Sequence, residues 1–244
     1  MGRIAQMRQQ ELLAATLTVI AQKGLSGITV NDIAKEAGCS FGVIAFHFKT
    51  KEKLLLAALN SLVEEYDEIW ARTAKLRTGS EAAAELAARI GADFDSRVTS
   101  RSKLAVWAAF WGEASRIPAY RATCGKLKRR YRAEALKLVS LIAKDHGHDV
   151  DAEVIAAGLN ALVDGFWIYG HVTGDFGAAE RERARLACTA FLRATFPDFF
   201  PIGETPQAGS NSASEGDPRP EVAAVMLRRQ VGDKKPGRRS AAAK

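Results

Sequence analysis

Three aromatic residues, Trp107, Phe110 and Trp111, stand close together in this 244-residue chain. Trp107 and Trp111 are four positions apart, which places both indole rings on one face of a helix, with Phe110 beside them. Aromatic faces attract a quaternary ammonium group, which cannot donate a hydrogen bond, and a nearby carboxylate strengthens that attraction. Glu113 and Asp164 could each supply the carboxylate. The pattern is therefore compatible with a cage for a small organic cation.

A second aromatic group, Phe166, Trp167 and Tyr169, follows Asp164 and could supply further walls of such a cage. The same residues also have a purely structural interpretation, because aromatic side chains on a buried helix commonly belong to the core. Asp164 could equally satisfy a polar partner in a subunit interface, with Gly165 allowing helices to approach closely. At the level of sequence, a cation cage and an aromatic core both remain open.

A different chemistry is indicated over residues 29–48, where the residue types follow the pattern of a helix-turn-helix. Thr29 can cap a first short helix, and Asp32 three positions later completes a capping box. Gly38 permits a turn at positive φ, and Ser40 can cap the second short helix. A small residue, a glycine, a cap and a short helix in this order predict a DNA-binding element. The alternative is a generic helical hairpin inside an all-α core.

The exposed residues of the second short helix would enter the major groove of DNA. Serine and small apolar side chains can contact base edges there, whereas basic and hydroxyl side chains at the flanks bind phosphates. The predicted groove-facing residues are Ser40, Phe41, Gly42 and Ala45, with Phe46 near the groove edge. The predicted phosphate contacts are Thr29, His47, Lys49 and Lys51.

The elements that must position these residues are helices throughout. Helical periodicity runs through nearly every segment up to Phe196, and no convincing alternating strand occurs, so the expected fold class is all-α. Nine helices are predicted, over residues 8–23, twice within 29–47, and over 50–77, 80–97, 101–116, 118–145, 150–172 and 177–196. The helix over 50–77 joins the two functional regions and is the expected lever between them.

Composition narrows the class of protein. A net charge of +7 and a pI near 9.4 favour an anionic partner such as nucleic acid. The odd number of widely spaced cysteines (Cys39, Cys124 and Cys188) indicates reduced thiols. The sequence contains neither an apolar signal core nor a stretch long enough to span a bilayer, which predicts a cytoplasmic protein without a membrane partner. It offers no nucleophile–base pair, phosphate loop or metal set, so neither an enzyme nor a cofactor is expected.

Residues after Pro201 differ sharply from the rest. Gly, Pro, Ser and Glu dominate residues 203–220 and the chain ends in a basic segment, which predicts a disordered basic tail over 201–244. This tail could add non-specific DNA affinity through phosphate contacts, or it could be a solvated terminus without a role. The expected organisation is a DNA-binding domain over 1–52, a ligand-binding and dimerisation domain over 53–200, and the tail.

Residues 8–55 resemble the DNA-binding domain of the TetR family of repressors, above all in the stretches Thr29–Gly38 and Phe46–Leu55. One departure is Ala45, which stands where many members carry a tyrosine, so a usual phosphate contact is missing. The resemblance implies three N-terminal helices for DNA and six C-terminal helices for ligand binding and dimerisation. It also implies a palindromic operator in double-stranded DNA, from which a small ligand releases the repressor.

The C-terminal half resembles one branch of that family, the choline-responsive repressors of glycine-betaine synthesis, in residues 107–115, 118–120 and 162–167. This resemblance implies choline as effector and control of the genes that oxidise choline to betaine. Two alternatives remain: a TetR-type repressor with a different aromatic or lipophilic effector, and a helical interaction module that no longer reads DNA.

Two further patterns concern surfaces. The segments 150–172 and 177–196 each carry a broad apolar face, which predicts a homodimer interface, although a single large monomeric core could use the same pattern. Gly158 and Gly165 would let helices approach closely there. The basic run over 126–132 predicts a solvated helix face, with membrane or additional DNA contact as the lesser alternative.

Overall fold

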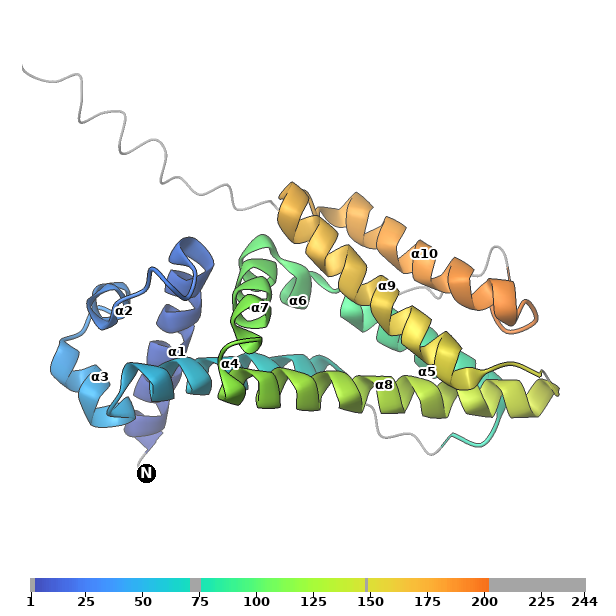
Figure 1. The fold of residues 1–244 in the computed structure, drawn as a ribbon, viewed down its shortest axis with the longest axis horizontal. Helices are drawn as coiled ribbons and strands as arrows, with labels where there is room; N and C mark the ends of the chain where they lie inside the picture. The colour runs from blue at the N-terminus through green and yellow to red at the C-terminus, as the bar shows by residue number, and fades with distance from the viewer. Residues whose placement is uncertain (1–2, 71–75, 148, 202–244) are drawn as a thin grey trace, which may run out of the picture. The chain divides into compact units, whose positions relative to one another are not determined.

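The computed structural model describes residues 3–70, 76–147 and 149–201, and within these ranges every regular element is a helix (Figure 1). The predicted all-α fold class is therefore confirmed. The helices are α1 (Arg3–Lys23), α2 (Val30–Glu36), α3 (Phe41–Phe48), α4 (Lys51–Trp70), α5 (Gly79–Asp93), α6 (Ser96–Thr99), α7 (Arg101–Ala114), α8 (Pro118–His146), α9 (Ala152–Thr173) and α10 (Ala178–Thr195).

The described residues form ten helices where nine were predicted, because the helix expected over 80–97 ends at Asp93. The carboxylate of Asp95 accepts a hydrogen bond from the backbone N–H of Arg97 at 2.8 Å, which starts the single-turn helix α6. An aspartate in this cap competes with continuation of the helix. The first helix also begins earlier than predicted, at Arg3. Residues 71–75 of the expected helix over 50–77, and the predicted tail after Pro201, lie outside the described residues.

The capping pattern read from the sequence is present at the helix-turn-helix. The Thr29 hydroxyl accepts a hydrogen bond from the backbone N–H of Asp32 at 3.1 Å, and the Asp32 carboxylate accepts one from the Thr29 N–H at 2.9 Å. Lys23 reaches across from α1 to the same carboxylate at 2.5 Å. Its hydrogen bond is the main reason why the pKa of Asp32 is lowered to about 2. Gly38 has φ +58°, as the predicted turn requires.

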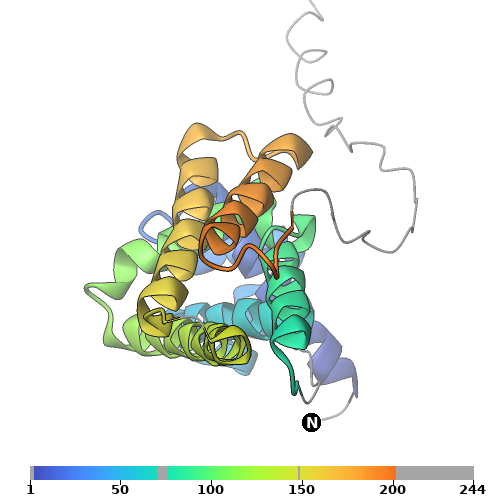
Figure 2. The same cartoon turned by 90° about the vertical axis from the view of Figure 1, so that its right-hand side faces the viewer.

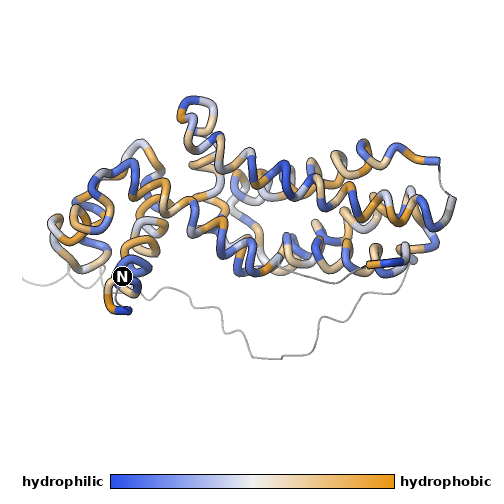
Figure 3. Tube along the Cα trace, turned by 90° about the horizontal axis from the view of Figure 1, so that it is seen from below, coloured by the Kyte–Doolittle hydropathy of each residue, from blue (hydrophilic) through white to orange (hydrophobic). Residues whose placement is uncertain are grey.

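The larger helical group is built on α8, which packs against α5, α7 and α9, while α10 packs against α9 (Figure 2). Apolar and polar residues alternate along each of these helices, so one side of each can be buried (Figure 3). Gly158 of α9 brings its backbone against the Phe191 ring of α10, where an added Cβ would lie 2.8 Å from the ring. Gly158 therefore serves packing within the chain, whereas a Cβ added at Gly165 would meet no described atom within 4 Å outside its own helix backbone.

The helices α1, α2 and α3 pack against the rest of the described chain mainly through α4 and α7. The helix α4 packs against α1 and α3 near its start and against α5 and α8 further along (Figure 1). The helix α7 contacts α1 directly. Lys103 of α7 forms an ion pair with Glu65 of α4 beside this contact. Among the described helices, none is long and apolar enough to cross a lipid bilayer.

Candidate functional site

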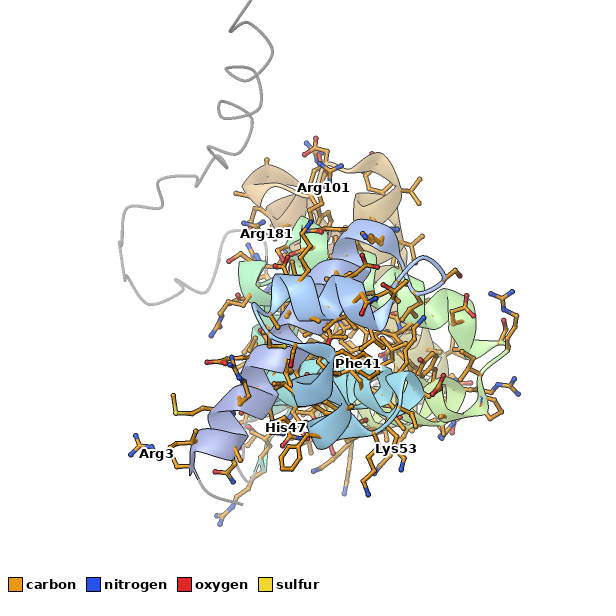
Figure 4. All side chains as sticks on the ribbon, turned by 90° about the vertical axis from the view of Figure 1, so that its left-hand side faces the viewer. Arg3, Phe41, His47, Lys53, Arg101 and Arg181 are labelled. Carbon is orange, nitrogen blue, oxygen red and sulfur yellow. The ribbon has the colours of Figure 1, made fainter. Side chains whose placement is uncertain are left out.

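The helix α3 exposes two large apolar side chains. Phe46 is 81% exposed and Phe41 is 58% exposed, whereas Ile44 and Phe48 on the opposite side are buried against the core. Figure 4 looks onto this end of the molecule, with Phe41 and His47 facing the viewer and Arg3 and Lys53 beside them. Exposed aromatic rings next to basic side chains on a short helix indicate a surface that a partner covers.

Three of the predicted DNA contacts, Ser40, Lys51 and Thr29, lie at helix ends, where their side chains can also act within the chain. Ser40 occupies the N-cap position of α3, but its hydroxyl makes no capping hydrogen bond within the described chain. Lys51 was expected to bind phosphate, but its Nζ donates a hydrogen bond to the Ile28 carbonyl oxygen at 2.5 Å and so ties α4 to the loop before α2. Thr29 is exposed, with its hydroxyl engaged in the capping box.

The remaining predicted contacts lie on or beside the exposed side of α3. Gly42 is exposed and Ala45 is half-buried. His47 packs edge-on against the Phe46 ring, with 5.2 Å between ring centroids. Lys49 is exposed and ends the helix with φ +61°. The structure adds Lys53 to this surface (Figure 4). Sequence reasoning missed it, although it follows the Thr50 cap by only three positions.

Some of the residues predicted for an aromatic cage come together where α7, α8 and α9 meet, although Trp107 itself is buried. The rings of Trp107, Trp111 and Trp167 contact one another, with 5.9 to 6.1 Å between centroids, and Trp111 stacks on both of the others. The ammonium of Lys128 lies 4.6 Å from the centroid of Trp111 and 5.7 Å from that of Trp167. It also forms an ion pair with Asp164. We call Trp111, Lys128, Asp164 and Trp167 the ammonium site, because two ring faces and a carboxylate together hold a positive charge.

The ammonium site opens into a groove of about 450 Å³. Its lining residues are Trp111, Ala114, Arg121, Cys124, Gly125, Lys128, Asp164 and Ile168. Within the groove wall, the indole Nε1 of Trp111 is buried and has no hydrogen-bond acceptor among the described residues. A buried donor without a partner costs about 1–3 kcal/mol.

A second aromatic cluster lies deeper. Its carboxylate, Asp93, is buried and accepts hydrogen bonds from the Tyr66 hydroxyl and, at 2.7 Å, from Trp70 Nε1. Tyr131 contacts both rings, at 5.0 and 4.2 Å between centroids. We call these four residues the inner cluster. Trp167 joins it to the ammonium site, because its Nε1 donates to the backbone oxygen of Asp93 at 2.9 Å.

Burial dominates the electrostatics of the inner cluster. It raises the pKa of Asp93 to about 6, and the hydrogen bonds from Tyr66 and Trp70 only partly offset this rise. Burial and the neighbouring Asp93 also raise the pKa of Tyr66 far above its usual value. Sequence reasoning missed the inner cluster. Tyr66 and Trp70 have the same four-residue spacing that identified Trp107 and Trp111, so the pattern for finding them was present.

Three residues predicted for the cage lie elsewhere. Phe110 is fully buried against Tyr120, and Phe166 packs against Phe94, which agrees with the core interpretation. Glu113 pairs with Arg116 and lines a separate groove, near Lys51, because two positions after Trp111 it lies on another face of α7. The core interpretation therefore holds for Phe110 and Phe166, and the cage stays a prediction for Trp111, Asp164 and Trp167.

The basic run over 126–132 is a solvated face for the most part, as predicted: Lys126, Arg129, Arg130 and Arg132 are exposed. Arg130 also forms an ion pair with Asp67 of α4. Lys128 is the exception, because its ammonium lies against the tryptophans. The partners of these two residues, Trp111 and Asp164 for Lys128 and Asp67 for Arg130, lie on other helices. The local charge pattern of α8 could not reveal them.

A helix-turn-helix with an exposed second helix, followed by a group of longer helices that holds an aromatic groove, is the arrangement of a DNA-binding regulator. Residues 12–58 match the family described as bacterial regulatory proteins, tetR family, and residues 82–197 match the BetI-type transcriptional repressor C-terminal domain. The chain belongs to the TetR family of transcriptional repressors and carries a C-terminal domain of BetI type.

Similar proteins agree with this assignment. The HTH-type transcriptional regulator BetI of Paraburkholderia phymatum is 31% identical over 175 residues, covering 70% of this chain and 84% of that protein. The protein of the same name from Stenotrophomonas maltophilia is 31% identical over 180 residues, covering 72% and 88%. A putative regulator from Pseudomonas aeruginosa is 26% identical with a TM-score of 0.62, covering 79% of this chain and 92% of its own. A Saccharomonospora viridis regulator, solved in complex with choline, is 24% identical with a TM-score of 0.62, covering 77% and 96%.

Ala45 leads to a first prediction. Replacing it with tyrosine, the residue many family members carry there, is expected to raise DNA affinity roughly fivefold, because a hydroxyl–phosphate hydrogen bond contributes on the order of 1 kcal/mol. Fluorescence anisotropy with labelled upstream DNA at fixed salt measures the change. Ala45→Phe is the matched control, since it adds the ring without the hydroxyl. An equal gain in both variants would show that the ring, and not a phosphate hydrogen bond, is responsible.

Proposed function

We propose that this repressor is released from its operator by choline and controls the genes that convert choline to glycine betaine. The observation that carries the proposal is the ammonium site. There the protein holds the alkylammonium of its own Lys128 over Trp111 and Trp167 and beside Asp164. A site that accommodates one ammonium in this way has the chemistry to accommodate another.

Choline suits the site in two respects. Its trimethylammonium group needs no hydrogen-bond acceptor, so the ring faces of Trp111 and Trp167 and the charge of Asp164 supply what it requires. Its hydroxyl oxygen could accept the hydrogen bond that the buried Nε1 of Trp111 lacks among the described residues. The groove of about 450 Å³ is within the usual range for a small-molecule site.

The similar proteins support the same chemistry. The relatives from P. phymatum and S. maltophilia carry the name BetI, and the S. viridis regulator, which has the same fold, was solved with choline. By the family's mode of action, we further propose that the repressor is a homodimer and that each protomer reads one half of a palindromic operator. The exposed apolar residues Val154 and Leu186, on α9 and α10, would be covered in such a dimer.

The site can reach the DNA-binding helices by two routes. Trp107 and Trp111 belong to α7, which packs directly against α1. Tyr66 and Trp70 belong to α4, whose first turns pack against α1 and α3. A cation bound between α7 and α9 would therefore shift helices that also position α3. Small shifts of packed helices are a common way to switch between two states.

The proposal is tested with purified protein and the DNA upstream of its own gene, by fluorescence anisotropy with and without choline. We expect choline to release the wild-type protein. Trp111→Ala is expected to bind DNA unchanged but to lose the response, because the ring nearest to the bound cation is gone. Trp111→Phe, which keeps a smaller ring, is the matched control and should respond at higher choline concentrations. Persistence of the complex at high choline would contradict the choline proposal, and release by another metabolite would then identify a different effector.

A further inference from the structure

We infer that Lys128 is a built-in competitor of the effector: its ammonium occupies the ammonium site in the unliganded protein and must leave before an external cation can bind. This inference rests on the proposed function for the nature of the effector, but it concerns a property of the chain itself. It makes Lys128 the residue that sets the concentration at which the repressor responds.

The first argument is that Lys128 uses the same groups that an effector would need. Its Nζ lies 4.6 Å from the centroid of Trp111 and 5.7 Å from that of Trp167, both within the range of a cation–π contact. The same Nζ is paired with Asp164. A second cation placed over these rings would overlap with Lys128 or repel it. The two occupants therefore exclude each other.

The second argument is that Lys128 is able to leave. Its side chain is 36% exposed and that of Asp164 is 39% exposed, so the ion pair lies at the mouth of the groove and not in the core. A half-exposed ion pair contributes little to stability because water screens it, and the lysine stem can turn into solvent. Asp164, the carboxylate that pairs with Lys128, belongs to α9. Arg121 of α8 lines the same groove and adds a second positive charge to it.

The third argument is the cost of this exchange. When the binding-competent state is only a fraction of the population, the apparent dissociation constant rises by the inverse of that fraction. If Lys128 fills the site about nine-tenths of the time, the affinity for an external cation falls about tenfold. Arg121 and a displaced Lys128 would also repel a cation. The protein would then respond only when the effector is abundant, which suits a metabolite that accumulates.

Displacement of Lys128 has a structural consequence as well. Its contacts with Trp111 and Asp164 join α8 to α7 and α9 at one point. An external cation would again contact Trp111 on α7 and Asp164 on α9. Because it is not attached to α8, α8 would lose its link to both helices at this point. Exchange of a tethered cation for a free one thus changes which helices the site holds together.

The test compares wild type with Lys128→Met, which keeps the length of the stem but removes the charge, and with Lys128→Arg, which keeps the charge. Binding of choline and of tetramethylammonium is measured by isothermal titration calorimetry and by tryptophan fluorescence. We expect Lys128→Met to bind both cations about tenfold more tightly than wild type, and Lys128→Arg to remain near wild type. Without ligand, the tryptophan emission of Lys128→Met should already differ from wild type, because the cation over Trp111 is missing.

The outcomes separate this inference from the proposed function. Equal or weaker cation binding by Lys128→Met, with folding confirmed by circular dichroism, would overturn the inference while choline release of DNA could still stand. Tighter binding of tetramethylammonium by Lys128→Met without any release of DNA by choline would uphold the inference and contradict the proposed effector. If none of the three proteins binds either cation, both are wrong.

Discussion

Replacing Asp93 with asparagine is expected to stabilise the protein above pH 6 and to remove a pH dependence of its stability. Burial raises the pKa of Asp93 to about 6, so the folded state holds a proton that the unfolded chain releases near pH 4. Between these values the folded state binds more protons, and the free energy of unfolding therefore falls as pH rises from 4 to 6. The shift corresponds to a loss of about 3 kcal/mol that is complete above pH 6. Asparagine keeps an oxygen acceptor for Tyr66 and Trp70 without the charge.

The measurement is urea unfolding of both proteins at a series of pH values from 4.5 to 8. We expect the difference in the free energy of unfolding to grow toward neutral pH and then to level off. Asp95→Asn is the contrasting control, because the hydrogen bond from Arg97 lowers the pKa of Asp95 and its charge stabilises the fold at neutral pH. That variant should be less stable than wild type at neutral pH. If the free energy of unfolding depended on pH in the same way in wild type and Asp93→Asn, the pKa of Asp93 would not be raised in the folded protein.

Replacing Phe46 with glutamate is expected to reduce DNA affinity by at least roughly a hundredfold, because a carboxylate would replace an apolar contact and face phosphates, and such like-charge contacts cost several kcal/mol. Phe46 is 81% exposed in the free protein, so its replacement should leave the free energy of unfolding nearly unchanged. Anisotropy titrations with operator DNA at several salt concentrations measure the affinity, and urea unfolding measures the stability.

Ala133→Glu provides the matched control, since it makes the same change of charge at an exposed position of α8. It should reduce affinity only slightly, through the net charge of the protein. If both variants lost affinity equally, the effect would be one of overall charge and α3 would not be the reading helix. If Phe46→Glu bound DNA as well as wild type, Phe46 would lie outside the interface.

Local patterns in the sequence were sufficient to predict most of the fold. The capping box between Thr29 and Asp32, the turn at Gly38 and the helical periodicity each involve residues a few positions apart, so the sequence displays them directly. The break after Asp93 was missed because periodicity continued through a residue, Asp95, whose side chain starts a new helix. At this point the helical periodicity favoured one continuous helix and the Asp95 cap favoured a new one, and the structure follows the cap.

The candidate site was only half predictable, for the opposite reason. Trp107 and Trp111 reveal themselves by their spacing on one helix, but their partners lie far away in the chain. Lys128 pairs with Asp164, 36 positions later, and Trp167 donates to the Asp93 carbonyl, 74 positions earlier. Such contacts depend on how α5, α8 and α9 pack. A charge run on α8 gives no indication of which of its members turns inward.

The contact between α1 and α7 determines how this repressor could be engineered. The helix that carries Trp107 and Trp111 packs against the first helix of the DNA-binding end. Consider a chimera in which the residues after Thr50 come from a different repressor. In it, the side of α1 that packs against α7 would face residues that do not fit its side chains. We expect functional hybrids only when that side of α1 is transplanted together with these residues. In recombination between paralogues, α1 would then be inherited with the ligand specificity of α7, although it lies in the DNA-binding part of the sequence.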